Sequence, residues 1–202
     1  MPSTLLLLLR LPFLLLTFSH STAARKTSHN ATTSSSHLVR TSCQHASYPS
    51  LCLHTLSTSP AQTPRDLAQA AVSVSLSRTR KVSAFLSQLS RSTSSSSPKR
   101  QRVSISDCVE QVSDSVDELS RTLEELHHLH EETFRWQMSD AQTWVSAALT
   151  NEDTCLDGFQ DVDGKVKADV KRKITDAARV TSNALYMINR LDESRGRPRS
   201  KP

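Results

Sequence analysis

From about residue 64 onward, apolar residues recur along the chain at steps of three and four, the pattern of amphipathic helices. The clearest case is a segment that begins at Ser106, where the spacing between apolar residues alternates between four and three over about four turns. A second stripe follows Thr63 and Pro64, a typical N-cap followed by proline in the first helical position. The two stripes are Val112, Val116, Leu119, Leu123 and Leu126 in the first, and Leu67, Ala71, Val74, Val82, Phe85 and Leu89 in the second.

Two further helices are predicted toward the C-terminus. Ser139 is expected to cap a helix that runs through Trp144, at core spacing, to about Phe159, and glycines then mark a turn. The last helix is expected to span residues 165 to 191. No run of alternating β-branched residues competes with these helices. Four amphipathic helices joined by short links predict an all-α fold, an up-down-up-down four-helix bundle.

The N-terminal part of the chain differs in composition from the helical region that follows it. Residues 1–24 combine apolar runs with small residues before Ala24, which predicts a secretory signal peptide. Residues 25–37 are mostly Ser, Thr and basic residues, which predicts a disordered arm carrying a glycosylation sequon at Asn30. Residues 38–57 suggest two short helical pieces bent at Pro49, an N-terminal helical hairpin extension.

The folded domain is therefore expected to cover residues 38–192, with a basic disordered tail over 193–202. A signal peptide would deliver the protein to an oxidising compartment, where its four cysteines can pair. Cys108 lies at the start of the second bundle helix and Cys155 near the end of the third. Those ends meet in an antiparallel pair, so a bond between Cys108 and Cys155 would join the two helices. A bond from Cys43 to Cys52 would then close the hairpin. Zinc ligation fits poorly, because the cysteines do not form close C-x-x-C pairs.

Enzyme chemistry finds little support. The three glycines form no phosphate-binding loop, and no G-x-S-x-G motif positions a nucleophile, so neither a catalytic set nor a cofactor site is predicted. His127, His128 and His130 stand close together, but without a cysteine or acidic ligand at suitable spacing they indicate a solvated helix end. We expect no metal there.

Charge divides the chain into unlike parts. The formal net charge is +5, yet residues 107–132 hold nine acidic residues and only one basic residue, Arg121, whereas basic residues crowd the start of the last helix. At about 100° per residue, Glu110, Asp114 and Asp117 fall with Arg121 on one side of the helix, nearly opposite the apolar stripe. The plain interpretation is a solvated face. With 4% aromatic residues, nucleic acid is an unexpected partner.

Several motifs resemble those of a known family. They are Thr41-Ser42-Cys43 through Tyr48-Pro49-Ser50-Leu51-Cys52, then Asp107-Cys108 opening a helix, then the specific segment from Gln142 to Phe159, which reads QTWVSAALTNEDTCLDGF. Together they look like the plant invertase and pectin methylesterase inhibitor family over residues 38 to about 192. The resemblance implies a secreted, apoplastic inhibitor with a four-helix bundle and disulfides joining the first cysteine to the second and the third to the fourth.

Within that family two targets are open. Invertase inhibitors typically carry a Pro-Lys-Phe tripeptide, and the matching stretch here, residues 131–136, has no proline. The 142–159 segment is also nearer to pectin methylesterase inhibitors, so a 1:1 complex with pectin methylesterase is expected, with acid invertase as the alternative. Trp136, in that stretch, could cover the bundle end or form an exposed contact. By resemblance the contact residues would be Glu110, Asp114, Asp117, Thr154 and Asp157.

Overall fold

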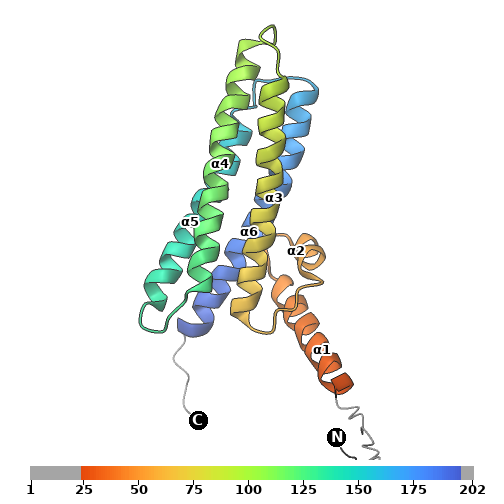
Figure 1. The fold of residues 1–202 in the computed structure, drawn as a ribbon, viewed down its shortest axis with the longest axis vertical. Coiled ribbons are helices and arrows are strands. Elements are labelled where there is room, and N and C mark those ends of the chain that lie inside the picture. The colour runs from red at the N-terminus through yellow and green to blue at the C-terminus, as the bar shows by residue number, and fades with distance from the viewer. Residues whose placement is uncertain (1–23, 197–202) are drawn as a thin grey trace, which may run out of the picture.

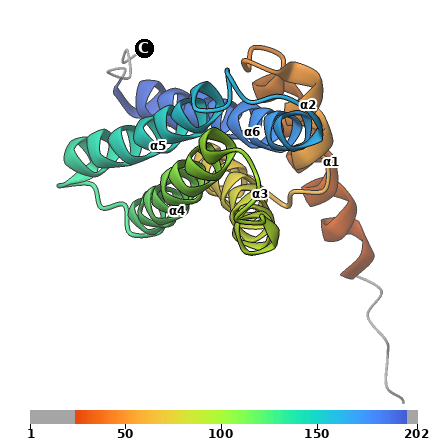
Figure 2. The same ribbon diagram turned by 90° about the horizontal axis from the view of Figure 1, so that it is seen from above.

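The protein's structure, a computed structural model, describes residues 24–196 and places six helices there without a strand (Figure 1). The four long helices α3 to α6 form the bundle, and α1 and α2 make a hairpin beside it (Figures 1 and 2). The all-α fold class is confirmed. The helices are α1 (Ala24–Cys43), α2 (Pro49–Leu56), α3 (Pro64–Ser92), α4 (Lys99–His127), α5 (Phe134–Asp157) and α6 (Lys165–Gly196).

The bundle is arranged as a square. The main packing pairs are α3 with α4, α4 with α5, α5 with α6, and α6 with α3, so α4 lies diagonally across from α6 (Figure 2). Short connections between successive helices make the topology up-down-up-down, as the hydrophobic periodicity predicts. Among the described helices, none combines the length and apolar character that crossing a membrane requires.

The start of α3 is formed as the sequence predicts. The backbone N–H of Asp66 donates to the hydroxyl of Thr63 at 3.1 Å, and Asp66 Oδ2 accepts from the Thr63 N–H at 3.0 Å. This reciprocal capping box has proline in the first helical turn. Partial burial raises the pKa of Asp66, but hydrogen bonds from Thr63 and from the Gln62 backbone N–H outweigh it and hold the pKa below its ordinary value.

Two predicted helix starts are wrong. Helix α4 begins at Lys99, seven residues before Ser106, and α5 begins at Phe134, five residues before Ser139. Tertiary contacts extend both helices. The hydroxyl of Ser104 in the first turns of α4 donates to the carbonyl of Gly158 at 2.6 Å. Phe134 is buried at the other end of the bundle.

The segment expected to be a disordered arm, residues 25–37, is helical in the structure, because α1 extends from Ala24 to Cys43. The C-terminal half of α1 makes tertiary contacts that composition alone does not reveal. Val39 is buried, and the hydroxyl of Ser35 donates to the carbonyl of Ser59 at 2.6 Å.

At the other end of the chain, α6 continues through Gly196, beyond the predicted helix end at Leu191, so residues 193–196 of the expected tail are also helical. The predicted signal peptide, apart from Ala24, and residues 197–202 lie outside the described residues.

The hairpin is fastened to α6 by one side-chain amide. The Asn183 Oδ1 accepts from the backbone N–H of Tyr48 at 2.9 Å, and its Nδ2 donates to the Tyr48 carbonyl at 3.1 Å. The Arg179 guanidinium also lies over the Tyr48 ring, 5.4 Å from its centroid. These contacts hold the bend between α1 and α2 against the bundle.

Both expected disulfide bonds are present. Cys43 and Cys52 join α1 to α2 with a Cα–Cα distance of 5.5 Å. Cys108 and Cys155 join α4 to α5 across 4.6 Å. The second bond closes a much longer loop, with a sequence separation of 47 against 9.

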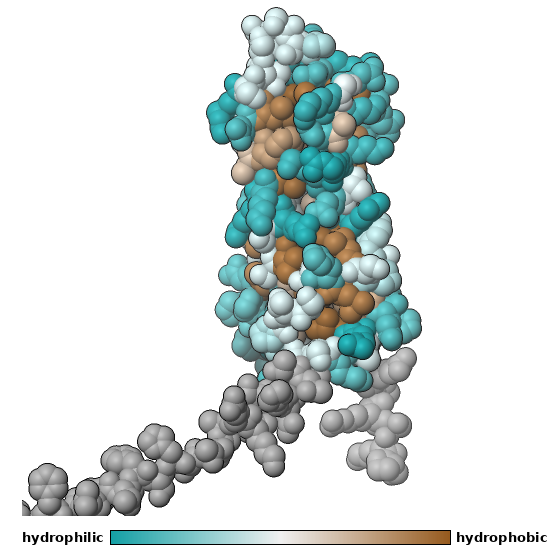
Figure 3. Space-filling view, turned by 90° about the vertical axis from the view of Figure 1, so that its right-hand side faces the viewer, coloured by the Kyte–Doolittle hydropathy of each residue, from teal (hydrophilic) through white to brown (hydrophobic). Residues whose placement is uncertain are grey.

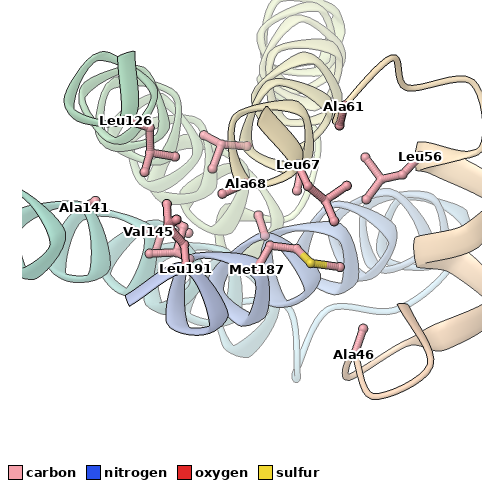
Figure 4. Packing of buried hydrophobic residues seen from close by; sticks show 14 of the residues in the cluster. Ala46, Leu56, Ala61, Leu67, Ala68, Leu126, Ala141, Val145, Met187 and Leu191 are labelled. Atoms are coloured by element: carbon pink, nitrogen blue, oxygen red, sulfur yellow. The ribbon is translucent and has the colours of Figure 1, made fainter. Parts of the chain in front are cut away.

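The core consists of two hydrophobic clusters. The larger joins the hairpin to the lower bundle in the orientation of Figure 1, where Leu67, Met187 and Leu191 meet side chains of the neighbouring helices (Figure 4). The smaller includes Val82, Val112 and Cys155. Between the two clusters, each bundle helix contributes at least one buried polar residue. This polar layer consists of Ser75 and Thr79 from α3, Ser115 from α4, Glu152 from α5 and Thr181 from α6.

Candidate functional site on the outer face of α4 and α5

The register between α4 and α5 is set by three contacts. Ser104 bonds to the carbonyl of Gly158, Cys108 is joined to Cys155, and the Ser115 hydroxyl donates to the Ala148 carbonyl at 3.1 Å. The N-terminal half of α4 therefore lies beside the C-terminal half of α5. This places the two helix segments that hold the predicted contact residues next to each other.

All five predicted contact residues are exposed. Glu110, Asp114 and Asp117 lie on the side of α4 opposite Val112 and Leu119, which are fully buried. Thr154 and Asp157 flank Cys155 on α5, and the disulfide register places them level with the first turns of α4. Glu110 is thus level with Thr154, whereas Asp114 and Asp117 lie further along, beside the middle of α5.

The three predicted contact acids of α4 have free carboxylates. Within residues 24–196, no hydrogen bond or ion pair engages the carboxylates of Glu110, Asp114 or Asp117. The α5 residues are more constrained. Thr154 donates its hydroxyl to the Thr150 carbonyl at 2.8 Å, and Asp157 Oδ1 accepts from the side-chain amide of Gln160 at 3.0 Å. The face therefore presents mainly hydrogen-bond acceptors and negative charge.

Glu118 shows the local effect of this charge. Partial burial raises its pKa, and the negative charges of Asp114 and Asp117 add to the rise. A hydrogen bond from the Asn151 amide at 3.0 Å acts in the opposite direction. The negative field of the outer face thus reaches the seam between α4 and α5.

The same seam holds Trp144, which the spacing assigns to the core. Trp144 is instead half-buried, and the guanidinium of Arg121 lies 4.8 Å from its ring centroid. Since Arg121 covers the indole from α4, the single base of the acidic segment is held by an aromatic ring. Trp136 is 77% exposed and does not cover the bundle end.

The three histidines lie exposed around the C-terminus of α4. His128 Nδ1 is 2.9 Å from the Glu124 carbonyl, and the His127 carbonyl accepts from Arg65. In the part of the chain that the structure describes, no three His, Cys, Asp or Glu side chains are placed to hold a metal ion.

Sequence reasoning misses one unusual residue, Glu152. Its carboxylate is fully buried, and Oε1 accepts from the hydroxyls of Thr79 at 3.0 Å and Thr181 at 3.1 Å. Oε2 has no hydrogen-bond partner. Burial raises the pKa of Glu152 to about 7, although the two threonine hydrogen bonds favour the charged form. Helical spacing could have found it, because Ala148, Glu152 and Cys155 lie on one face of α5.

Comparison with known proteins identifies this architecture. The sequence model of the plant invertase/pectin methylesterase inhibitor family matches residues 37–187, most of the chain. The chain belongs to this family. The match includes both disulfides and the entire outer face of α4 and α5. Family membership confirms the expectation that the protein is an inhibitor rather than an enzyme.

Relatives within the family support the assignment. The chain is 48% identical over 170 residues to pectinesterase inhibitor 3 of Arabidopsis thaliana, covering 80% of this chain and 82% of that protein. Pectinesterase inhibitor 9 of the same plant is 40% identical over 174 residues, covering 80% and 83%. The crystal structure of a mutant form of an Arabidopsis pectin methylesterase inhibitor shares the fold, with a TM-score of 0.60 at 21% identity, covering 73% of this chain and 92% of that one.

Proposed function

We propose that the protein inhibits plant pectin methylesterase, docking the outer face of α4 and α5 over the enzyme's substrate cleft in a 1:1 complex. The observation that carries the proposal is the set of exposed, unpaired carboxylates at Glu110, Asp114 and Asp117. They coincide with positions that the family resemblance implies as contacts. Two relatives, at 48% and 40% identity, are named pectinesterase inhibitors.

Electrostatic complementarity explains why an acidic face suits this target. The esterase forms an anionic polymer, polygalacturonate, so its cleft is expected to favour carboxylates. A rigid helix can present carboxylates there with little ordering cost, because the opposite side of α4 is packed in the core. Inhibition then follows from occupying the cleft, and no inhibitor atom has to react.

Acid invertase is the second candidate target, because the family name covers inhibitors of both enzymes. The absence of a proline in residues 131–136 disfavours it. In the structure this stretch forms the turn before α5 and its first residues.

The proposed site of action is the cell wall. Secretion is supported by the apolar N-terminal segment and by the two disulfides, which form in oxidising compartments. Glycosylation at Asn30 is part of the same proposal, since the sequon would pass through the secretory pathway. Mass measurement of the secreted protein, before and after glycosidase treatment, tests the N-terminus and the modification together.

Two parallel assays test the target. Purified mature protein is titrated into a plant pectin methylesterase and into an acid invertase. We expect esterase activity to fall in proportion to added inhibitor and to vanish near one equivalent, with invertase unaffected. Potent inhibition of invertase beside an unaffected esterase would replace the proposal with the second candidate.

A further inference from the structure

A basic groove lies between α3 and α6, the edge of the square opposite the α4–α5 edge. Its volume is about 510 Å³, and four cationic side chains and one carboxylate line it, a formal charge of +3. The residues that line it are Arg78, Lys81, Val82, Arg172, Lys173 and Asp176. The proposed esterase contact leaves this groove uncovered.

Two of the cations are held in place by neighbours. Arg78 is paired with Asp176, the only carboxylate of the groove, and Lys173 Nζ lies 4.7 Å from the centroid of the Phe85 ring. These contacts fix the direction in which the groove's cations point. Because Asp176 is paired with Arg78, no other carboxylate in the groove offsets the charge of its remaining cations.

The other two cations are available to a ligand. Lys81 is exposed, and in residues 24–196 no hydrogen bond or ion pair engages its amine. The Arg172 side chain is 69% exposed and makes one ion pair, from Nη2 to Asp169 Oδ1 at 3.2 Å. Asp169 also pairs with Lys165, so its single negative charge does not fully offset the positive charge of Arg172.

The surroundings indicate what kind of anion fits. Buried Val82 gives the groove an apolar floor between its charged rims. On the side of the molecule seen in Figure 3, hydrophilic side chains surround separate groups of hydrophobic ones. Sugar acids combine apolar ring faces with carboxylates, which matches an apolar floor and cationic rims better than an all-phosphate chain does.

We propose that the groove binds de-esterified polygalacturonate, the anionic product that pectin methylesterase forms. The choice of this ligand rests on the proposed function, whereas the groove's charge does not. Methyl esters are uncharged, so the groove discriminates the product from the substrate. The acidic face of α4 repels the same polymer, which therefore approaches from the α3–α6 side. Bound in this way, the inhibitor accumulates where the esterase has already acted.

The test uses the full mature chain and immobilised polygalacturonate without any esterase. The variant K81E/R172E removes the two available cations, and R40E/R135E is its control, with the same change in net charge at exposed positions outside the groove. We expect the groove variant to lose about tenfold in affinity and the control less than about twofold. Binding of the parent protein is expected to weaken with salt and to be lost on fully methyl-esterified polymer. Circular dichroism establishes that both variants are folded.

Three results would overturn the inference. These are no binding of the parent at low salt, equal losses in both variants, and equal affinity for polyphosphate of matched charge. Because esterase inhibition is measured in a separate assay, failure of polymer binding and failure of inhibition are distinguishable.

Discussion

The hydroxyl of Thr79 in α3 donates to the carboxylate of Glu152 in α5 in the interior of the bundle, at 3.0 Å. Thr181 in α6 donates to the same oxygen, and its own hydroxyl oxygen lies 2.7 Å from that of Ser75. This network connects three helices at the level where the two hydrophobic clusters separate. Its buried carboxyl group links protonation to the stability of the bundle.

The first prediction concerns pH. Burial raises the pKa of Glu152 from its ordinary value of 4.5 to about 7, so the folded state holds this proton more tightly than the unfolded state. The resulting stabilisation is fully present below about pH 4.5 and is lost as pH rises to about 7, an effect of up to about 3 kcal/mol. Urea unfolding across this range measures it.

Glu152→Gln should flatten that pH profile, because the amide cannot ionise. The control is Asp140→Asn, which removes an exposed charge elsewhere on α5, away from Glu152. The control should retain the profile of the parent protein. An unchanged profile in Glu152→Gln would exclude the buried carboxyl as its source.

The second prediction compares the two disulfides. Replacing Cys108 and Cys155 together by alanine should destabilise the protein more than replacing Cys43 and Cys52, because the longer loop restricts the unfolded chain more. The chain-entropy relation gives about 4 and about 3 kcal/mol for the two bonds. Thermal unfolding of both double variants measures the order. A greater loss in the Cys43/Cys52 variant would show that the hairpin depends on its bond more than loop length implies.

The third prediction concerns the end of α4. The guanidinium of Arg65 in α3 donates to the carbonyls of Leu126 at 3.0 Å and His127 at 2.6 Å, which are left without helical partners. Arg65→Ala should therefore cost about 1–2 kcal/mol of unfolding free energy. Arg80→Ala is the control, since Arg80 makes one long contact, 3.4 Å to Ser120. Equal stability of the two variants in urea would refute the capping role.

The bundle itself could be predicted because helical periodicity is a local sequence signal that does not depend on distant contacts. The positions of Cys108 and Cys155 near helix ends agree with an antiparallel pair. The start of α3 was predictable for the same reason, as Thr63 and Asp66 form a cap from adjacent residues. The starts of α4 and α5 were not, since contacts from Ser104 and Phe134 to distant helices extend them.

The candidate site shows the same division. The outward direction of Asp114 and Asp117 follows from helical phase, and the structure leaves both exposed. The groove between α3 and α6 could not be predicted, because its cations come from segments about 90 residues apart and meet only through packing. The contact between Trp144 and Arg121 could not be predicted either, because the two residues lie on different helices.

The central claim is that the acidic outer face of α4 binds the esterase, and inhibition by the variant D114K/D117K tests it most directly. Lysine at these exposed positions should weaken inhibition of pectin methylesterase about 100-fold and leave thermal stability nearly unchanged. The groove variant K81E/R172E, assayed in parallel, should inhibit like the parent protein. A folded D114K/D117K variant of full potency would contradict the account and leave the acidic stripe as solvated surface.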